Sequence, residues 1–233
     1  MRINYISFLI VLFATTSVFS QTAIDSTISN LNNYRWQIEA AIGDSKGLSP
    51  YKEGYYSSDA TRNFGSVVIN SVDLGIAYNF SKLLDFKLNV GFDRFTNKDS
   101  KSLPFETAQF RTMLQGVINV NNWVKFQPET SRFKLLLHGG MSLSFLQNIE
   151  SNTSNRASTR DLNGGIVMGI TPMYRIAKKT HLFFDLSSYT NFRQHRTWDG
   201  NYAAGNENLV GKMINVSIGL NVSFGKQVRF KNY

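Results

Sequence analysis

The last apolar segment of the chain alternates apolar and polar residues with a period of two. From Ile214 to Phe224 every second residue is apolar, and the residues between them are asparagine, serine or glycine. Successive side chains of a β-strand point to opposite faces, so this pattern predicts a strand with one apolar and one polar face. A soluble sheet must cover its apolar face with another layer, whereas a membrane barrel turns that face to lipid and its polar face inward.

Seven further segments repeat the alternation, near residues 34–43, 72–80, 86–93, 105–121, 133–145, 165–175 and 182–187. The connections at 44–64, 96–104, 147–162 and 191–209 are long, and those at 81–84, 122–132 and 178–180 are shorter. This order predicts an all-β fold, an eight-stranded antiparallel up-and-down transmembrane β-barrel with long extracellular loops and short periplasmic turns. A soluble lipocalin-like barrel, with the faces reversed, is the alternative. Pro172 lies inside a strand, where we expect a local bulge.

The ends of the chain suggest export. Arg2 precedes an apolar run at residues 8–14, and residues of small or modest size, Val18 and Ser20, stand before Gln21 at the positions that a signal peptidase inspects, so residues 1–20 are predicted to be a signal peptide. We expect a flexible segment at 21–33, the barrel at 34–225 and a basic periplasmic tail at 226–233. The expected location is the bacterial outer membrane with both termini periplasmic. With no cysteine in the chain, disulfides, thiolate metal sites and a lipoprotein anchor are excluded.

Positive charge gathers at the predicted periplasmic end. The formal net charge is +9, and removal of Arg2 with the signal peptide leaves +8. The basic residues at this end are Lys125, Arg132, Lys134, Lys178, Lys179, Lys226, Arg229 and Lys231. We expect them to form a rim facing anionic phospholipid headgroups, and docking to a periplasmic partner or the cell wall is the alternative. Nucleic-acid binding does not fit an exported protein.

Charged residues of both signs fall on the predicted inner face: Glu39, Asp73, Lys87, Asp93, Arg111, Arg175 and Asp185. An unpaired buried charge is costly, so these side chains are expected to pair. The favoured interpretation is a salt-bridged plug that rigidifies a closed barrel. The alternative is a small or gated pore in which Arg111 exchanges between Asp73 and Glu39.

The sequence offers little for catalysis. Its histidines, His138, His181 and His195, fall at different predicted heights in the barrel, and no metal-ligand spacing or phosphate-binding glycine loop is present. We therefore predict no enzyme activity and no cofactor or metal, and a lipid-modifying enzyme is the least favoured alternative. The long loops also contain aromatic residues: Tyr51, Tyr55, Tyr56, Trp198 and Tyr202. Anchoring at the headgroup level is favoured for them over a recognition surface.

Four segments resemble the N-terminal transmembrane barrels of outer-membrane protein A-like (OmpA-like) proteins: Gly91–Phe95, Arg111–Val120, Gly169–Arg175 and Gly219–Gln227. The resemblance extends over nearly all of residues 34–227. It implies a non-enzymatic barrel that serves envelope integrity, slow solute passage, or adhesion and partner binding. The family typically continues into a peptidoglycan-binding domain, which we do not expect in a chain that stops at Tyr233. The expected partners are outer-membrane lipids and other envelope proteins, in a structural or accessory-subunit role.

Overall fold

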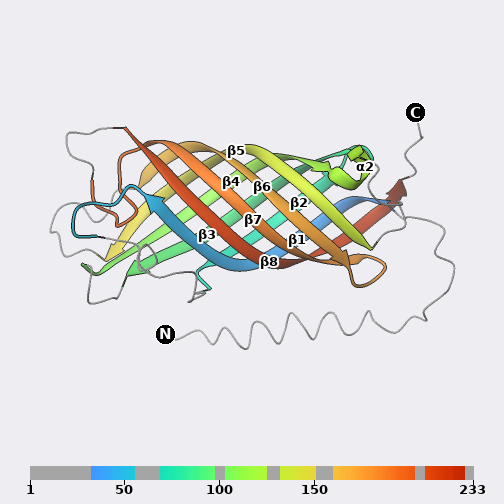
Figure 1. The fold of residues 1–233 in the computed structure, drawn as a ribbon, viewed down its shortest axis with the longest axis horizontal. Helices are drawn as coiled ribbons and strands as arrows, with labels where there is room; N and C mark the ends of the chain where they lie inside the picture. The colour runs from blue at the N-terminus through green and yellow to red at the C-terminus, as the bar shows by residue number, and fades with distance from the viewer. Residues whose placement is uncertain are drawn as a thin grey trace. The chain divides into compact units, whose positions relative to one another are not determined.

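The chain forms a closed barrel of eight antiparallel strands in which β1 pairs with β8 (Figure 1). The computed structural model describes residues 33–55, 69–97, 103–124, 132–150, 160–202 and 208–228. The predicted fold class is thereby confirmed. The expected signal peptide, most of the flexible segment and the end of the basic tail lie outside the described residues.

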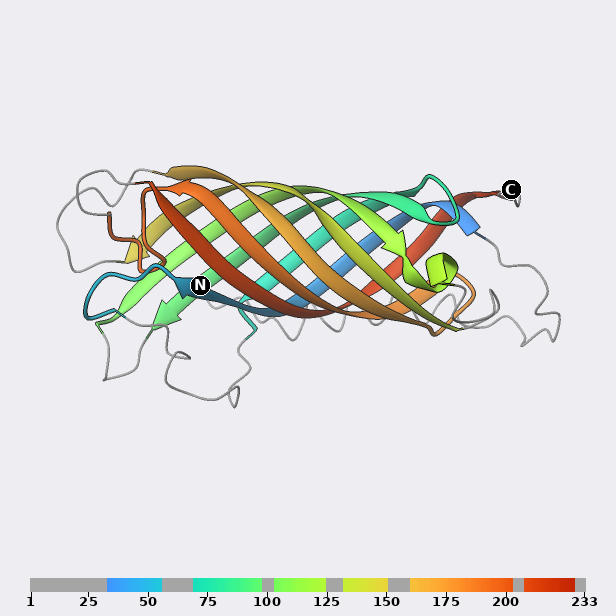
Figure 2. The ribbon, with the colours of Figure 1, turned by 45° about the horizontal axis from the view of Figure 1, so that its top comes forward.

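The strands follow one another around the barrel in chain order. They are β1 (Asn33–Ser49), β2 (Ser71–Asn79), β3 (Leu84–Asn97), β4 (Phe105–Asn119), β5 (Phe133–Glu150), β6 (Asp161–Arg175), β7 (Thr180–Gln194) and β8 (Leu209–Val228). The strand ends that the long connections join lie at one end of the barrel, here called the loop end. The strand ends that the short connections join lie at the other, the turn end, where β1 begins and β8 ends (Figure 2).

The pairing register fixes the tilt of the strands. Starting at Gln37 and stepping from partner to partner around all eight strands leads back to Gly47 on β1, ten residues further on. A shear of this size in an eight-stranded barrel gives strongly tilted strands and an interior just wide enough for side chains to fill. Residues far apart in sequence therefore meet inside the barrel.

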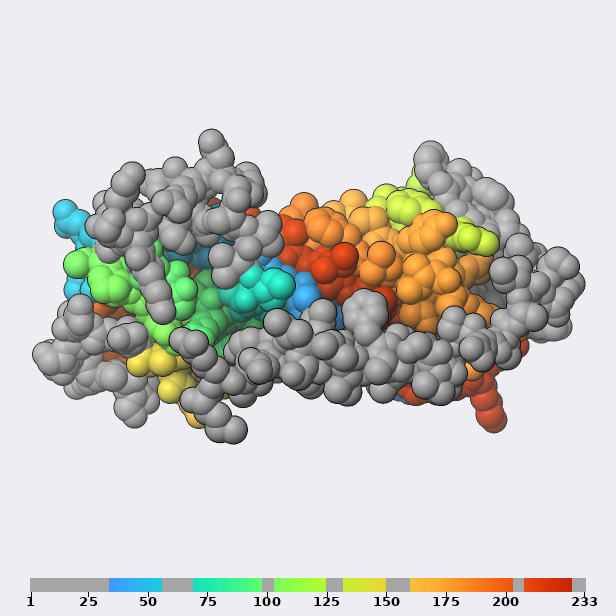
Figure 3. Space-filling model, turned by 90° about the horizontal axis from the view of Figure 1, so that it is seen from below, coloured from blue at the N-terminus to red at the C-terminus, as the bar shows by residue number. Residues whose placement is uncertain are grey.

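The outer face of the barrel is apolar. Outward side chains in the middle of the strands are exposed and apolar, including Leu88, Leu114 and Ile218 at 47%, 55% and 50% exposure. In the space-filling view the atoms of β8 lie directly against those of β7 (Figure 3). On β8 the outward apolar positions run from Ile214 to Phe224, eleven residues, which matches the length that a tilted strand needs to cross the hydrocarbon core. The polar residues point inward, so the lipocalin-like alternative is wrong.

Aromatic side chains border the turn end of this apolar surface. Outward aromatic residues there are Trp36, Tyr78, Phe80, Phe86, Phe133, Tyr174 and Phe224. The rings of Trp36 and Tyr78 meet edge to face at 4.8 Å. Toward the loop end, Phe110 lies against both Phe92 and Phe145 at 4.7 and 5.1 Å. Two aromatic zones flanking an apolar band are the pattern of a transmembrane barrel.

Three local features differ from the sequence-based expectation. Several strands continue beyond their predicted ends at the loop end, β1 to Ser49 and β5 to Glu150, because strand pairing persists where the alternation fades. Residues Val120–Val124 form a short helix, α2, in place of the last part of the fourth predicted strand. No bulge occurs at Pro172: the β6–β7 register is the same on both sides of it. The missing N–H interrupts the ladder there without shifting it. Among the described residues, no helix has the length and apolarity to cross a membrane.

Candidate functional site: the barrel lumen

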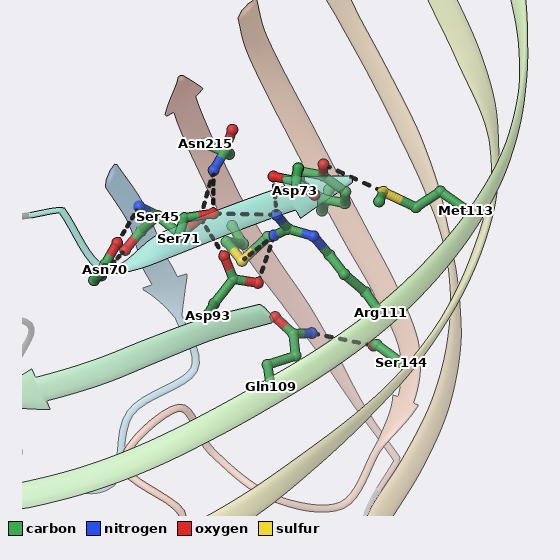
Figure 4. Close-up of polar contacts among 12 residues, drawn as sticks. Ser45, Asn70, Ser71, Asp73, Asp93, Gln109, Arg111, Met113, Ser144 and Asn215 are labelled. Carbon is green, nitrogen blue, oxygen red and sulfur yellow. Dashed lines mark hydrogen bonds and ion pairs between the residues drawn. The ribbon is translucent and has the colours of Figure 1, made fainter. Parts of the chain in front are cut away.

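Arg111 on β4 is the centre of the polar interior and is only 3% exposed. Its Nη1 contacts Asp93 Oδ2 at 2.6 Å and its Nη2 contacts Asp73 Oδ2 at 2.8 Å, so one guanidinium joins carboxylates of β2 and β3 (Figure 4). The guanidinium also lies 4.8 Å from the centre of the Tyr189 ring. Gly91 lies between Asp73 and Arg111 in the register. A Cβ there would approach Arg111 Nε to 2.6 Å, so the missing side chain lets the guanidinium cross this strand.

Hydroxyl and amide groups complete the surroundings of this ion pair. Ser45 Oγ donates to Asp93 Oδ1 at 2.6 Å, and Arg111 Nη2 donates to Ser71 Oγ at 3.3 Å. Asn215 Nδ2 donates to both serine hydroxyls, at 2.7 and 2.9 Å. The network thus links β1, β2, β3, β4 and β8 across the lumen. Burial of charged groups is tolerated where such bonds satisfy them.

A second group of charges lies nearer the turn end. Lys87 Nζ contacts Glu39 Oε2 at 3.3 Å. His138 faces an oxygen with each ring nitrogen, Gln115 Oε1 at 2.6 Å from Nδ1 and Asp185 Oδ1 at 2.9 Å from Nε2. Thr171 Oγ1 donates to Asp185 Oδ1 at 2.5 Å, and Ser187 Oγ donates to Asp185 Oδ2.

Six of the seven predicted inward charges therefore belong to the lumen interior, where Glu39, Asp73, Asp93 and Asp185 face Lys87 and Arg111. Arg175 also points inward but lies at the turn end, beside His181 in the register. Arg111 contacts Asp73 and Asp93, while Glu39 contacts Lys87. We call the six residues together with His138 the ionic core.

Apolar side chains lie on both sides of the ionic core, which the sequence pattern did not indicate. An upper layer consists of Tyr55, Phe95, Phe105, Met113, Leu146, Val167, Tyr189, Trp198 and Met213; Phe95, Phe105 and Trp198 lie on its loop-end side, and Tyr189 and Met213 lie beside Arg111. A lower layer consists of Ala41, Leu136, Met173 and Phe183, of which Leu136, Met173 and Phe183 lie toward the turn end. The interior of a closed eight-stranded barrel is narrow enough for side chains to fill, and close-packed apolar side chains occupy the space that the polar groups leave. Met113 and Met213 are apolar residues at inward positions, where alternation predicts polar ones. This departure was the sequence feature that could have indicated the apolar filling of the lumen.

Residues 195–202, which follow β7, form a roof over the upper layer. Trp198 has no exposed surface, and its ring lies 5.0 Å from that of Phe95. Its Nε1 donates to the carbonyl oxygen of Ser49 at 2.8 Å, and a Cβ on Gly47 would approach its ring to 2.5 Å. The Lys52 backbone N–H donates to Asp199 Oδ1 at 2.9 Å. The roof is thereby attached to the loop end of β1.

Three of the loop aromatics, Tyr51, Tyr55 and Trp198, are not the interfacial anchors that we expected. Trp198 and Tyr55 are buried, at 0% and 6% exposure, and Tyr51 packs against the same apolar layer. The rim of a narrow barrel offers a closer apolar surface than the bilayer does, so these side chains turn inward. Tyr202 is 37% exposed and contacts the Arg196 guanidinium at 4.1 Å from its ring centre. Tyr56 lies outside the described residues.

The histidines occupy separate environments. His138 belongs to the ionic core, His181 faces the lumen at the turn end, and His195 Nδ1 lies 3.1 Å from Asp161 Oδ1 at the loop end. Both nitrogens of His138 face Gln115 and Asp185, which leaves neither directed at a serine hydroxyl. In the part of the chain that the structure describes, no group of three histidine or acidic residues is arranged to hold a metal ion.

Four of the predicted basic rim residues are exposed at the turn end: Arg132, Lys178, Lys179 and Lys226. Lys125, Arg229 and Lys231 lie outside the described residues. Lys134 occupies a different place from its predicted one, because it is the first inward position of β5, opposite Met173. It therefore faces the mouth of the lumen.

The lumen leaves little free volume. A cavity beside Glu39, Asp73, His138 and Asp185 has about 30 Å³ for the centres of water molecules. A single water needs about 10–15 Å³ by this measure, so the cavity accommodates about two. Its size suits hydration of the ionic core and is too small for an organic substrate.

No family model and no curated protein matches the chain. Solved structures similar to it include Neisserial surface protein A (14% identity, covering 82% of this chain and 97% of that one, TM-score 0.48). The outer membrane protein OprG from Pseudomonas aeruginosa is another (13% identity, 83% and 97% covered, TM-score 0.48). The N-terminal β-barrel domain of Pseudomonas aeruginosa OprF, a barrel of the OmpA-like kind, is a third (10% identity, 81% and 99% covered, TM-score 0.43). Likenesses at this level carry no argument about function, and the fold assignment rests on the strand pairing of this chain.

Proposed function

We propose that this protein is a structural β-barrel of the bacterial outer membrane whose lumen is sealed. The observation that carries the proposal is that apolar side chains fill the lumen toward both ends from the ionic core and that residues 195–202 roof its loop end. An ion crossing the barrel would have to leave water at both layers, which is unfavourable for any charge. The two layers thus favour an envelope-integrity or accessory-subunit role over a diffusion pore.

The outer face supports the membrane assignment. Its apolar band lies between two aromatic zones, and closed barrels of this kind cross bacterial outer membranes. We place both ends of the barrel chain and the exposed Arg132, Lys178, Lys179 and Lys226 on the periplasmic side. There they meet anionic headgroups of the inner leaflet, and lipid is the partner we assign to this rim.

The interior also supports a non-catalytic role. Its histidine bonds to the Asp185 carboxylate, and the adjacent cavity has room for about two waters. The lumen contains histidine and carboxylate side chains, which are common in catalytic sites, but here these groups bind other side chains of the ionic core.

Single-channel recording tests the proposal. We expect the purified full chain to give no reproducible openings in planar bilayers, at neutral pH and at both voltage polarities. A known eight-stranded barrel that conducts serves as a control for insertion. Reproducible openings of the unmodified chain would contradict the sealed lumen and favour the small or gated pore.

A further inference from the structure

His138 lies in the lumen and contacts strands on both sides of its own. Its side chain projects inward from β5 and is 2% exposed. In the register His138 stands opposite Gly169 of β6, and a Cβ on Gly169 would approach His138 Nε2 to 2.5 Å. The missing side chain lets the imidazole cross β6 and reach Asp185 on β7. Gln115 on β4 is its partner on the other side, so one ring connects β4, β5 and β7.

Both ring nitrogens of His138 face hydrogen-bond acceptors. Nε2 lies 2.9 Å from Asp185 Oδ1, and Nδ1 lies 2.6 Å from Gln115 Oε1. The amide nitrogen of Gln115 donates to Asn89 Oδ1 at 3.2 Å, which leaves the amide oxygen for the ring. A neutral imidazole has one donor and one acceptor nitrogen, whereas an imidazolium has two donors. Two acceptors therefore match the doubly protonated ring.

Asp185 has the hydrogen bonds of an ionised carboxylate. Thr171 Oγ1 donates to its Oδ1 at 2.5 Å, and Ser187 Oγ donates to its Oδ2. An ionised carboxylate only accepts hydrogen bonds, and here both oxygens do so. The proton between His138 and Asp185 therefore belongs to the imidazole.

The charge of the ionic core gives the same answer independently. Its four carboxylates and two basic side chains are those of Glu39, Asp73, Asp93, Asp185, Lys87 and Arg111. Lys87 and Arg111 contact the other three carboxylates, and Asp185 is paired with His138. Four carboxylates against two cations leave two negative charges in excess, and a charged His138 reduces the excess to one. Since unbalanced buried charge is costly, this balance favours the imidazolium whichever way the Gln115 amide is turned.

The groups around His138 come from every neighbouring strand. The titratable side chains that line the adjacent cavity, from β1, β2, β3 and β7, are Glu39, Asp73, Lys87, Asp185 and Tyr189. The lining side chains from β4 and β8 are uncharged: Met113, Gln115, Asn215 and Ser217. Histidine is the one side chain among all these whose ordinary titration range falls near neutral pH.

We propose that His138 is a buried imidazolium and acts as a pH-sensitive lock inside the barrel. In its charged form it donates to both Gln115 and Asp185 and connects β4, β5 and β7 through side chains. Loss of the proton removes one of these two hydrogen bonds and increases the negative excess of the ionic core. The folded barrel then retains a proton that the unfolded chain releases near neutral pH, so the stability of the barrel falls as the pH rises above neutral.

Nitrogen NMR of the full chain in lipid, with isotopically labelled histidine, measures the charge of the ring directly. We expect both ring nitrogens of His138 to carry protons at neutral pH and to give two similar, pyrrole-like resonances, as an imidazolium does. His181→Gln and His195→Gln remove the other two histidines in turn and thereby assign the signals. A pyridine-like nitrogen resonance from His138 at neutral pH would overturn the proposal.

Urea titration in phosphatidylcholine vesicles, repeated from neutral to alkaline pH, measures the lock. We expect the folding equilibrium constant to fall by up to about tenfold per pH unit until the folded barrel also releases the proton. Gln115→Glu places a carboxylate at Nδ1, so the decline should extend to a higher pH. His138→Gln removes the titrating ring and should abolish the decline. His195→Gln is the matched control, because His195 also faces a carboxylate, Asp161, but lies at the loop end outside the ionic core.

An equal decline in the unmodified chain and in His138→Gln would overturn the lock, because other groups would then account for the pH dependence. Loss of the decline in His195→Gln would overturn it as well. If His138→Gln and Gln115→Glu do not fold, the resonances of the unmodified chain still decide the charge of His138. None of these outcomes depends on whether the lumen conducts ions.

Discussion

Arg111 is the residue on which the buried charge balance depends most directly. Its guanidinium contacts Asp73 and Asp93, and Asp93 has no exposed surface. Arg111→Met removes the cation, leaves Asp93 with hydroxyl donors such as Ser45 and takes from Asp73 its guanidinium partner. Breaking a buried pair in this way costs about 3–5 kcal/mol, and we expect a loss of that size in the free energy of unfolding. Urea titration of the barrel in lipid vesicles, followed by tryptophan fluorescence, measures it.

The control for Arg111→Met combines it with Asp73→Asn and Asp93→Asn. Replacing all the charges of a buried group is often neutral where removing one is not. The triple variant should therefore recover most of the lost stability. If the single and triple variants are equally unstable, the effect of Arg111 comes from packing against Tyr189 and the neighbouring side chains.

Which residues point into the lumen was predictable, but which of them pair was not. Alternation placed Glu39, Lys87 and Arg111 on the inner face, and in the structure their side chains lie in the lumen. Lys87 on β3 reaches Glu39 on β1, a contact that depends on the strand tilt and on the height of each residue in the barrel. Both follow from the shear, which a period of two does not specify.

Among the larger elements, the roof formed by residues 195–202 is the least expected from sequence. A long connection rich in polar residues gave no sign that its tryptophan would fill the barrel mouth. The fit requires Gly47, whose missing side chain leaves room for the ring, and β1 precedes Trp198 by about 150 residues. Alternation is read within a single segment of the sequence. The contact between Trp198 and Gly47 joins two distant segments and forms only when the barrel closes.

Trypsin digestion tests the packing of the roof. Arg196 is 2% exposed and its Nη1 donates to the Gly200 carbonyl oxygen at 2.5 Å, so we expect little cleavage there in the folded chain. Trp198→Ala removes the side chain that packs the roof into the mouth and should raise the cleavage rate at Arg196 by about tenfold or more, through more frequent local opening. The exposed Arg193 and Arg160 are internal controls whose cleavage should change little.

On intact cells the same digestion reports orientation. Cleavage at Arg160 and Arg193 with sparing of Lys178 and Lys179 is expected when the loop end faces outward. Cleavage confined to Lys178 and Lys179 would reverse the assignment.

Unchanged cleavage at Arg196 in Trp198→Ala would contradict the prediction for the roof. It would show that other contacts of residues 195–202 are enough to hold the roof closed.

At the scale of the whole molecule, the stability of the barrel depends on which solvent surrounds its outer face. Leu114 lies midway between Phe110 and Ile118 on the outward side of β4 and is 55% exposed. Leu48 is similarly exposed at 53%, but it lies beyond the Lys46–Asp44 ion pair at the loop end of β1. Exposure alone does not distinguish these two leucines, whereas their depth in a bilayer does.

Arginine substitution at the two positions separates lipid from water as the surrounding medium. In a transmembrane barrel Leu114→Arg should cost about 2–4 kcal/mol, because arginine at the midplane must leave water, while Leu48→Arg near the interface should cost about 0–1 kcal/mol. Urea titration in phosphatidylcholine vesicles measures both. In a barrel surrounded by water both substitutions would be nearly neutral, since each leucine is half-exposed. Equal small effects would therefore contradict the membrane assignment, and a difference of about 2 kcal/mol or more would establish that lipid covers the apolar face.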